Sequence, residues 1–169
     1  MKFFSGFALK NDSYLCEKYL IDSEFNVAGL SFGAIKAVEY ALNCTSRIDT
    51  IQLFSPAFFQ EKSEKFKRTQ LLYFSKDNAL YIDNFLKNCF YPSNMDDKIE
   101  IFSAKKYDLE KLLKYNFSHE ELDVLNHRGI RIEVYLGSED KIVDTKRARE
   151  FFISNCDIFW LQDVGHFLS

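Results

Sequence analysis

The sequence lacks the charge excess and the long apolar runs that mark two large classes of protein. It carries 22 Lys and Arg residues against 25 Asp and Glu residues, a net charge of −3, and no long block of one sign. Nucleic-acid-binding proteins usually show a clustered basic excess, so we expect no nucleic-acid partner. No stretch approaches the roughly 18 apolar residues of a membrane span, so we expect no membrane partner either.

Paired cysteines and a secretion signal are also missing. The four cysteines show no C-x-x-C spacing, which predicts neither a zinc site nor a redox motif. The apolar run at the start of the chain is interrupted by Ser5 and Gly6 and reaches Lys10 without a cleavage site, so it is expected to be a strand. We therefore expect a cytoplasmic protein with reduced thiols.

Aromatic residues, in contrast, are abundant. Eighteen Phe, nine Tyr and one Trp bring the aromatic share to 17%. The length of 169 residues fits one domain. Such a content suits either a dense core or an apolar channel for a hydrophobic substrate. Composition alone leaves both interpretations open.

Short apolar runs alternate with helix-like stretches at both ends of the chain. The expected strands are 2–7, 25–28, 48–54, 130–136 and 157–161. Helices are expected over about 13–21, 34–43 and 144–154. This alternation predicts an α/β fold with a mostly parallel sheet of about five strands.

The middle of the chain has a different pattern. Charged, helix-compatible segments follow one another over about 58–128, are interrupted at Pro92, and include a capping box from Ser118 to Glu121. We therefore expect one domain, with a core of 1–57 and 129–169 and a helical lid inserted at about 58–128.

A G-x-S-x-G pentapeptide at 29–33 places Ser31 between an expected strand and an expected helix. This arrangement exposes a nucleophilic serine on a sharp turn, and the start of the helix favours a developing oxyanion. A glycine-rich turn without function is the alternative. The strand-turn-helix context favours Ser31 as a nucleophile.

A nucleophilic serine needs a base, and the chain contains only three histidines. His119 and His127 lie in the polar helical insertion, where a solvated histidine is ordinary. His166 follows the last expected strand, at the sheet edge where Ser31 is also expected. We identify His166 as the candidate general base.

The third member should be a carboxylate after the penultimate strand. Asp140 is the candidate, because it falls in the middle of a loop there, and Glu139 is the fallback. Asp144 is better explained as a helix cap. The chain order Ser, Asp, His is that of the α/β-hydrolases.

An oxyanion hole needs two backbone donors. The N–H of Phe32, next to the nucleophile, is one candidate. The turn at 5–7, which ends the first expected strand, resembles the His-Gly-aromatic turn of many hydrolases and makes the N–H of Phe7 the other. A glycine turn without function is an equally ordinary explanation of these residues.

Four segments together resemble the esterases that remove the methyl group from pimeloyl-[acyl-carrier protein] methyl ester in biotin synthesis, in particular the short BioV type. They are 4–7 (FSGF), 29–33 (GLSFG), 136–143 (LGSEDKIV) and 164–167 (VGHF). The resemblance implies a truncated α/β-hydrolase fold and a cytoplasmic serine carboxylesterase. It also implies that an acyl carrier protein delivers the substrate and that neither a metal nor a cofactor is needed.

The resemblance extends less clearly into the lid. The longer BioH esterases place a phenylalanine and, four residues on, a glutamine over the acyl chain, and Phe66 and Gln70 have that spacing. A purely structural pair is the alternative.

The chain departs from the family pattern in two places. The family's usual histidine before the oxyanion glycine is Ser5 here. Only about twenty residues separate Phe7 from Val27, which leaves no room for an extra strand and helix.

A cluster of cations in the lid is the candidate contact surface for an acidic carrier protein. It consists of Lys62, Lys65, Lys67 and Arg68. A solvated helix face is the alternative explanation. A second candidate docking surface is formed by Lys105, Lys106, Lys111 and Lys114.

Three other functions remain open on the sequence alone. They are a thioesterase, a general short-chain carboxylesterase, and a hydrolase-shaped binding module without turnover.

Overall fold

The computed structural model describes residues 1–169 and contains one five-stranded sheet whose neighbouring strands are all parallel. The strand order is β1-β3-β4-β6-β7. The bounds are β1 (Lys2–Phe4), β3 (Asn26–Leu30), β4 (Thr50–Phe54), β6 (Arg131–Gly137) and β7 (Asp157–Leu161). The prediction of a parallel sheet of about five strands is confirmed.

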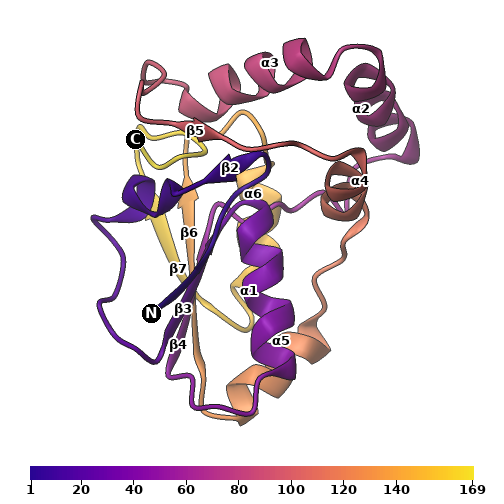
Figure 1. The fold of residues 1–169 in the computed structure, drawn as a ribbon. Coiled ribbons are helices and arrows are strands. Elements are labelled where there is room, and N and C mark those ends of the chain that lie inside the picture. The colour runs from indigo at the N-terminus through magenta and orange to yellow at the C-terminus, as the bar shows by residue number, and fades with distance from the viewer.

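Three helices form a layer against one face of this sheet (Figure 1). They are α1 (Phe32–Asn43), α5 (His119–His127) and α6 (Thr145–Phe152). α1 packs on β1, β3 and β4, while α5 contacts both α1 and β6. The ring of His119 stacks on Phe151 of α6 at 4.2 Å, which joins α5 to α6. Buried aromatic rings such as Phe58, Phe117 and Phe152 fill the space beneath these helices.

Two helices cross above the ends of the strands (Figure 1). They are α2 (Glu64–Lys76) and α3 (Asn78–Phe90), and α4 (Lys106–Lys114) packs against α2. Ser63 caps α2 and Asp77 caps α3 through hydrogen bonds to backbone N–H groups. α3 ends before Pro92, as the sequence predicts, and the expected cap of α5 by Ser118 is present. α5 also belongs to the range expected to form the lid. It lies instead against α1 and β6, at the opposite end of the sheet from α2 and α3 (Figure 1).

The prediction of a helix over 13–21 is wrong. Only a 3-10 helix, η1 (Asp12–Cys16), forms there. The N–H of Ile21 donates to Oε1 of Gln52, and the carbonyl of Tyr19 accepts from Nε2 of Gln52. Because Gln52 is a buried residue of β4, the sheet engages the backbone groups that a longer helix would have paired internally.

A second, two-stranded sheet joins the start of the chain to the segment between α3 and α4. β2 (Leu9–Lys10) pairs antiparallel with β5 (Glu100–Ile101). The expected strand at 2–7 is correspondingly shorter, because residues after Phe4 turn away toward β2.

No helix of the protein is long and apolar enough to cross a membrane.

Candidate active site

Ser31 occupies the sharp turn between β3 and α1. Its backbone has φ 54° and ψ −111°, an unusual conformation for a residue with a side chain. The turn is held from both sides: the N–H of Ser31 donates to the carbonyl of Phe54 at 2.8 Å, and its carbonyl accepts from Ala57 at 3.2 Å. The end of β4 therefore fixes the position of the serine.

Two glycines make this turn sterically feasible. A Cβ on Gly29 would overlap the carbonyl of Gly33, and a Cβ on Gly33 would overlap the carbonyl of Phe4 in β1. Helix α1 can therefore start directly against β3 and β1 only without side chains at these positions. The G-x-S-x-G spacing has this physical basis here.

His166 lies in the loop after β7 and is fully buried. Its Nε2 atom is 2.9 Å from Oγ of Ser31. Helix α3 holds the loop, because the N–H of Phe167 donates to the carbonyl of Cys89 and the ring of Phe167 packs edge-on against Phe90 at 4.9 Å. A helix above the strand ends thus supports the position of the histidine.

Asp140 lies in the loop after β6, and its side chain is fully buried. Oδ2 is 2.7 Å from Nδ1 of His166, and Oδ1 accepts the N–H groups of Ile142 and Val143 at 2.7 and 3.0 Å. Both carboxyl oxygens are therefore engaged. Neither Glu139 nor Asp144 takes this position, and Asp144 caps α6 by accepting the N–H of Arg147.

The three side chains form one hydrogen-bonded chain from carboxylate to imidazole to hydroxyl. A carboxylate only accepts hydrogen bonds, so Nδ1 carries the ring proton and Nε2 is free to accept the proton of the Ser31 hydroxyl. Such a chain can turn a serine into a nucleophile. The negative charge of Asp140 is also felt by Cys89, whose pKa is raised mainly by burial and further by that carboxylate.

The two predicted oxyanion donors are backbone N–H groups, one at the start of α1 and one in the turn after β1. Phe32 is the first residue of α1, where the amide has no acceptor within the helix. The N–H of Phe7 makes no hydrogen bond within the protein. Both side chains are buried.

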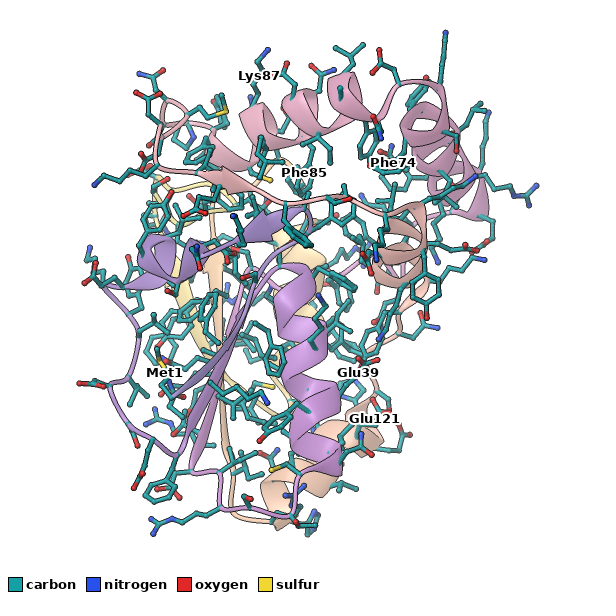
Figure 2. The ribbon with its side chains drawn as sticks, viewed as in Figure 1. Met1, Glu39, Phe74, Phe85, Lys87 and Glu121 are labelled. Carbon is teal, nitrogen blue, oxygen red and sulfur yellow. The ribbon has the colours of Figure 1, made fainter.

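A largely apolar pocket of about 570 Å³ lies between α2, α3 and α4. Phe7 and Ile142 line it on the side of the sheet, and Phe66 and Gln70 line it from α2. Figure 2 shows Phe85 on the inner side of α3 and Lys87 on its outer side. Ser31 is only 4% exposed and does not line this pocket, so the pocket ends short of the hydroxyl in this conformation.

Gln70 has a defined partner in this pocket. Its Oε1 atom accepts the hydroxyl of Tyr81 at 3.0 Å. Burial raises the pKa of Tyr81 to about 12, so its hydroxyl is a neutral donor at ordinary pH. Phe66 and Gln70 thus line the same pocket from α2, and their contact with an acyl chain stays a prediction.

The cation cluster predicted for a carrier protein is only partly available. Lys65 and Arg68 are exposed, and Lys62 is half-buried near the ring of Phe66. Lys67 is buried, and its Nζ atom lies 3.2 Å from the carboxylate of Glu64. The expected exposure of Lys67 is therefore not observed, because α2 turns that side chain inward, and its contact with a partner stays a prediction. In the second group, Lys111 pairs with Glu39 and Lys114 with Glu110.

Sequence reasoning missed residues that support this site without belonging to a motif. The backbone of Cys89 anchors the histidine loop, and the buried carboxyl of Asp12 accepts the N–H of Gly6 at 2.8 Å. Neither residue carries a sequence signal, since both act through contacts distant in the chain. No group of three or more His, Cys, Asp or Glu side chains is arranged to hold a metal ion.

No protein-family model and no curated protein sequence matches the chain. Solved structures do match. An esterase from Exiguobacterium antarcticum superposes with a TM-score of 0.65 at 14% identity, covering 83% of this chain and 59% of the other. Naproxen esterase from Bacillus subtilis gives a TM-score of 0.59 at 18% identity, covering 85% and 54%.

A third structure is similar over nearly the whole of both chains. BioG from Haemophilus influenzae gives a TM-score of 0.61 at 11% identity, covering 98% of this chain and 87% of the other. The chain thus spans little more than half the length of the two esterases but most of the length of BioG. Fold and topology agree with all three, and the chain therefore has the α/β-hydrolase fold in a shortened form with a five-stranded sheet.

Proposed function

We propose that the protein is a serine carboxylesterase that hydrolyses the methyl ester of pimeloyl-[acyl-carrier protein], with Ser31 as nucleophile, His166 as general base and Asp140 as the residue that orients the histidine. The observation that carries the proposal is the continuous hydrogen-bonded chain from Asp140 through His166 to Ser31. Esterases among the structural neighbours support the reaction class. The sequence resemblance to the BioV type supports the substrate.

The proposed reaction has two halves. His166 Nε2 accepts the hydroxyl proton as Oγ of Ser31 attacks the ester carbonyl, and the oxyanion is stabilised by the N–H groups of Phe7 and Phe32. The imidazolium then gives its proton to the departing methoxide, which leaves as methanol. Water, deprotonated by the same imidazole, attacks the acyl-enzyme, and the proton returns to Oγ as the free carboxylate is released.

The pocket beneath α2 and α3 suits the acyl chain. Its volume lies within the range of about 300–1,000 Å³ that is typical of small-molecule sites, and aliphatic and aromatic side chains such as Phe66, Leu109 and Leu113 line it. Phe7 joins the pocket to the predicted oxyanion loop. Because Ser31 is nearly buried, we infer that side chains at the inner end of the pocket shift when the ester reaches the hydroxyl.

The carrier protein is proposed to dock beside the mouth of this pocket. Lys76 lines the pocket, and Lys106 lies with it along a shallow depression beside α2. Together with Lys65 and Arg68, these exposed cations make no ion pair within the protein. An acidic partner whose prosthetic arm bears a phosphate would be attracted to such a surface. Its arm would then place the acyl chain at the pocket.

The reaction class is tested by labelling with a fluorophosphonate, which requires an activated serine. We expect one label per chain, on Ser31, and its absence would leave a hydrolase-shaped binding module as the explanation.

The substrate is tested by comparing kcat/KM for pimeloyl-[acyl-carrier protein] methyl ester, a p-nitrophenyl acetate ester and an acyl thioester of the same carrier. Preference for the methyl ester supports the proposal, whereas preference for the thioester or the acetate would favour a thioesterase or a general esterase.

A further inference from the structure

Asp12 is a fully buried carboxyl that the proposed triad does not use. Its Oδ2 atom accepts the N–H of Gly6 at 2.8 Å, and that is its one hydrogen bond within the protein, since Oδ1 is buried without a partner. The hydroxyl of Tyr14, two residues on, is also buried and unpaired. Burying a carboxyl with half of its acceptor capacity unmet is costly, so its contact with Gly6 calls for an explanation.

The contact lies one peptide bond away from the N–H proposed to bind the oxyanion. The carbonyl of Gly6 accepts the N–H of Leu9 at 3.3 Å, while its own N–H is held by Asp12. Gly6 is thus tied at both of its backbone groups. In a planar trans peptide the N–H points away from the preceding carbonyl, so fixing the Gly6 carbonyl also fixes the direction of the Phe7 N–H.

The segment after Phe7 shows why an anchor is needed. Ala8 has a positive φ of 62°, and the chain then enters β2, which pairs with β5 between α3 and α4. The carbonyl of Ala8 accepts the N–H of Phe102 at 2.7 Å. Any displacement of this part of the lid would therefore be transmitted to the turn at 5–7, which Asp12 holds through the Gly6 N–H.

We propose that Asp12 is a positioning residue for the oxyanion hole: by accepting the Gly6 N–H from a buried site, it fixes the Ser5–Gly6 peptide, from which the next peptide starts, so that the Phe7 N–H faces the acyl oxygen. This proposal rests on the proposed serine hydrolase function. The geometry favours it over a merely structural role, because the carboxyl contacts the one loop that carries the predicted donor and makes no other hydrogen bond.

The first experiment replaces Asp12 in the full chain and measures hydrolysis of a small p-nitrophenyl ester. Asp12→Leu keeps the branching at Cγ but removes the acceptor, and kcat is expected to fall by about tenfold to a hundredfold, with KM changed by less than about threefold. Asp12→Asn keeps an acceptor oxygen at the same place and should retain kcat within about threefold. Tyr14→Phe is the matched control, because it alters the same buried space without touching the Gly6 bond.

A second readout separates positioning from a general loss of structure. A trifluoromethyl ketone forms a tetrahedral adduct whose oxyanion needs the hole, so its inhibition constant should rise in Asp12→Leu in proportion to the loss in kcat/KM. The fraction of chains titrated by a fluorophosphonate at long times should stay that of the parent. Equal losses in Asp12→Leu and Asp12→Asn, or a loss confined to KM, would overturn the proposal.

The hydrogen bond itself is visible by NMR, because the chain holds only six glycines and 15N-glycine labelling gives a sparse spectrum. The Gly6 signal is identified by its loss in Gly6→Ala, and it should move upfield and exchange faster in Asp12→Leu, or in Asp12→Ser if the leucine variant does not fold. An unchanged Gly6 signal would refute the contact.

The failure of this proposal can be told from the failure of the proposed function. If the parent neither reacts with the fluorophosphonate nor hydrolyses esters, the proposed function fails. An active parent whose Asp12→Leu variant keeps full kcat refutes the role of Asp12 alone.

Discussion

Nε2 of His166 lies 2.9 Å from Oγ of Ser31, although 135 positions separate the two residues in the chain. The parallel sheet brings them together, because the turn after β3 and the loop after β7 leave the same edge. Strands β4 and β6 lie between β3 and β7, and Asp140 follows β6 at that edge. The three residues of the proposed triad thus follow three different strands, and the parallel sheet places them at one edge.

Replacing Ser31 tests the nucleophile. Ser31→Ala should lower kcat for ester hydrolysis by at least about a thousandfold and abolish fluorophosphonate labelling, because no other hydroxyl contacts His166 Nε2. The unfolding transition should stay close to that of the parent. Ser75→Ala on the exposed side of α2 is the control. Activity of Ser31→Ala within tenfold of the parent would show that another residue attacks the ester.

Two aspartates near each other in sequence should respond differently to replacement. Asp140→Asn should lower kcat by about 10⁴-fold through loss of the proper orientation and tautomer of His166. Asp144→Ala should leave kcat nearly unchanged and cost about 1 kcal/mol of unfolding free energy, because it removes the cap of α6. Steady-state kinetics and urea unfolding of both variants distinguish these effects, and the opposite pattern would reassign the acid.

Filling the pocket should affect long acyl chains alone. Asn84→Trp places a large ring from an exposed position of α3 into the pocket. The kcat/KM for a p-nitrophenyl octanoate should fall at least about tenfold, while that for the acetate should change by less than about twofold. Lys87→Trp on the outer side of the same helix (Figure 2) is the control and should affect neither ester. Equal losses on both esters would place the acyl chain elsewhere.

Reversing exposed cations of α2 and α4 that form no ion pair tests the carrier-docking proposal. The variant Lys65→Glu, Arg68→Glu, Lys76→Glu and Lys106→Glu should raise KM for the carrier-bound ester, and the penalty should shrink as salt rises, because exposed charges are screened over about 10 Å at 0.1 M. Hydrolysis of the acetate ester should change little. A control variant that reverses Lys111 and Lys114, which already form ion pairs, should have the smaller effect. No change with the carrier-bound ester would place the docking surface on another face.

The four thiols should react with iodoacetamide at very different rates. The pKa of Cys44 is lowered, first by its hydrogen-bonding contact with the Tyr40 hydroxyl, and the residue is half-exposed. Burial raises the pKa of Cys16, Cys89 and Cys156. Because the thiolate is the reactive form, a lower pKa means more of it at pH 7.5.

We therefore expect alkylation of Cys44 first, measured by peptide mass spectrometry of the native protein over time. Tyr40→Phe should slow that reaction, because it removes the group that stabilises the thiolate. Preferential modification of Cys89 would instead show that α3 opens readily from the histidine loop, since Cys89 is fully buried in this structure.

Much of the fold and of the candidate site follows from local sequence patterns. The apolar runs and the alternation of strand and helix predict the parallel sheet, and steric demands around Ser31 explain why glycines flank it at 29 and 33. Asp140 and His166 are identified by their place just after strands, because the ends of parallel strands share one edge. Caps such as Ser118 and Asp144 are also local, since each side chain binds a backbone group three residues on.

Other features depend on contacts between distant parts of the chain and have no local signal. The helix expected over 13–21 is replaced by the short 3-10 helix η1, because Gln52 of β4 binds the backbone of Tyr19 and Ile21. Lys67 belongs to a cationic run in the sequence, yet α2 turns it toward the interior, and only the packing of α2 against its neighbours determines which face is buried. Asp12 and Cys89 approach the site through hydrogen bonds to loops whose positions the sheet and α3 set, so the tertiary structure alone reveals them.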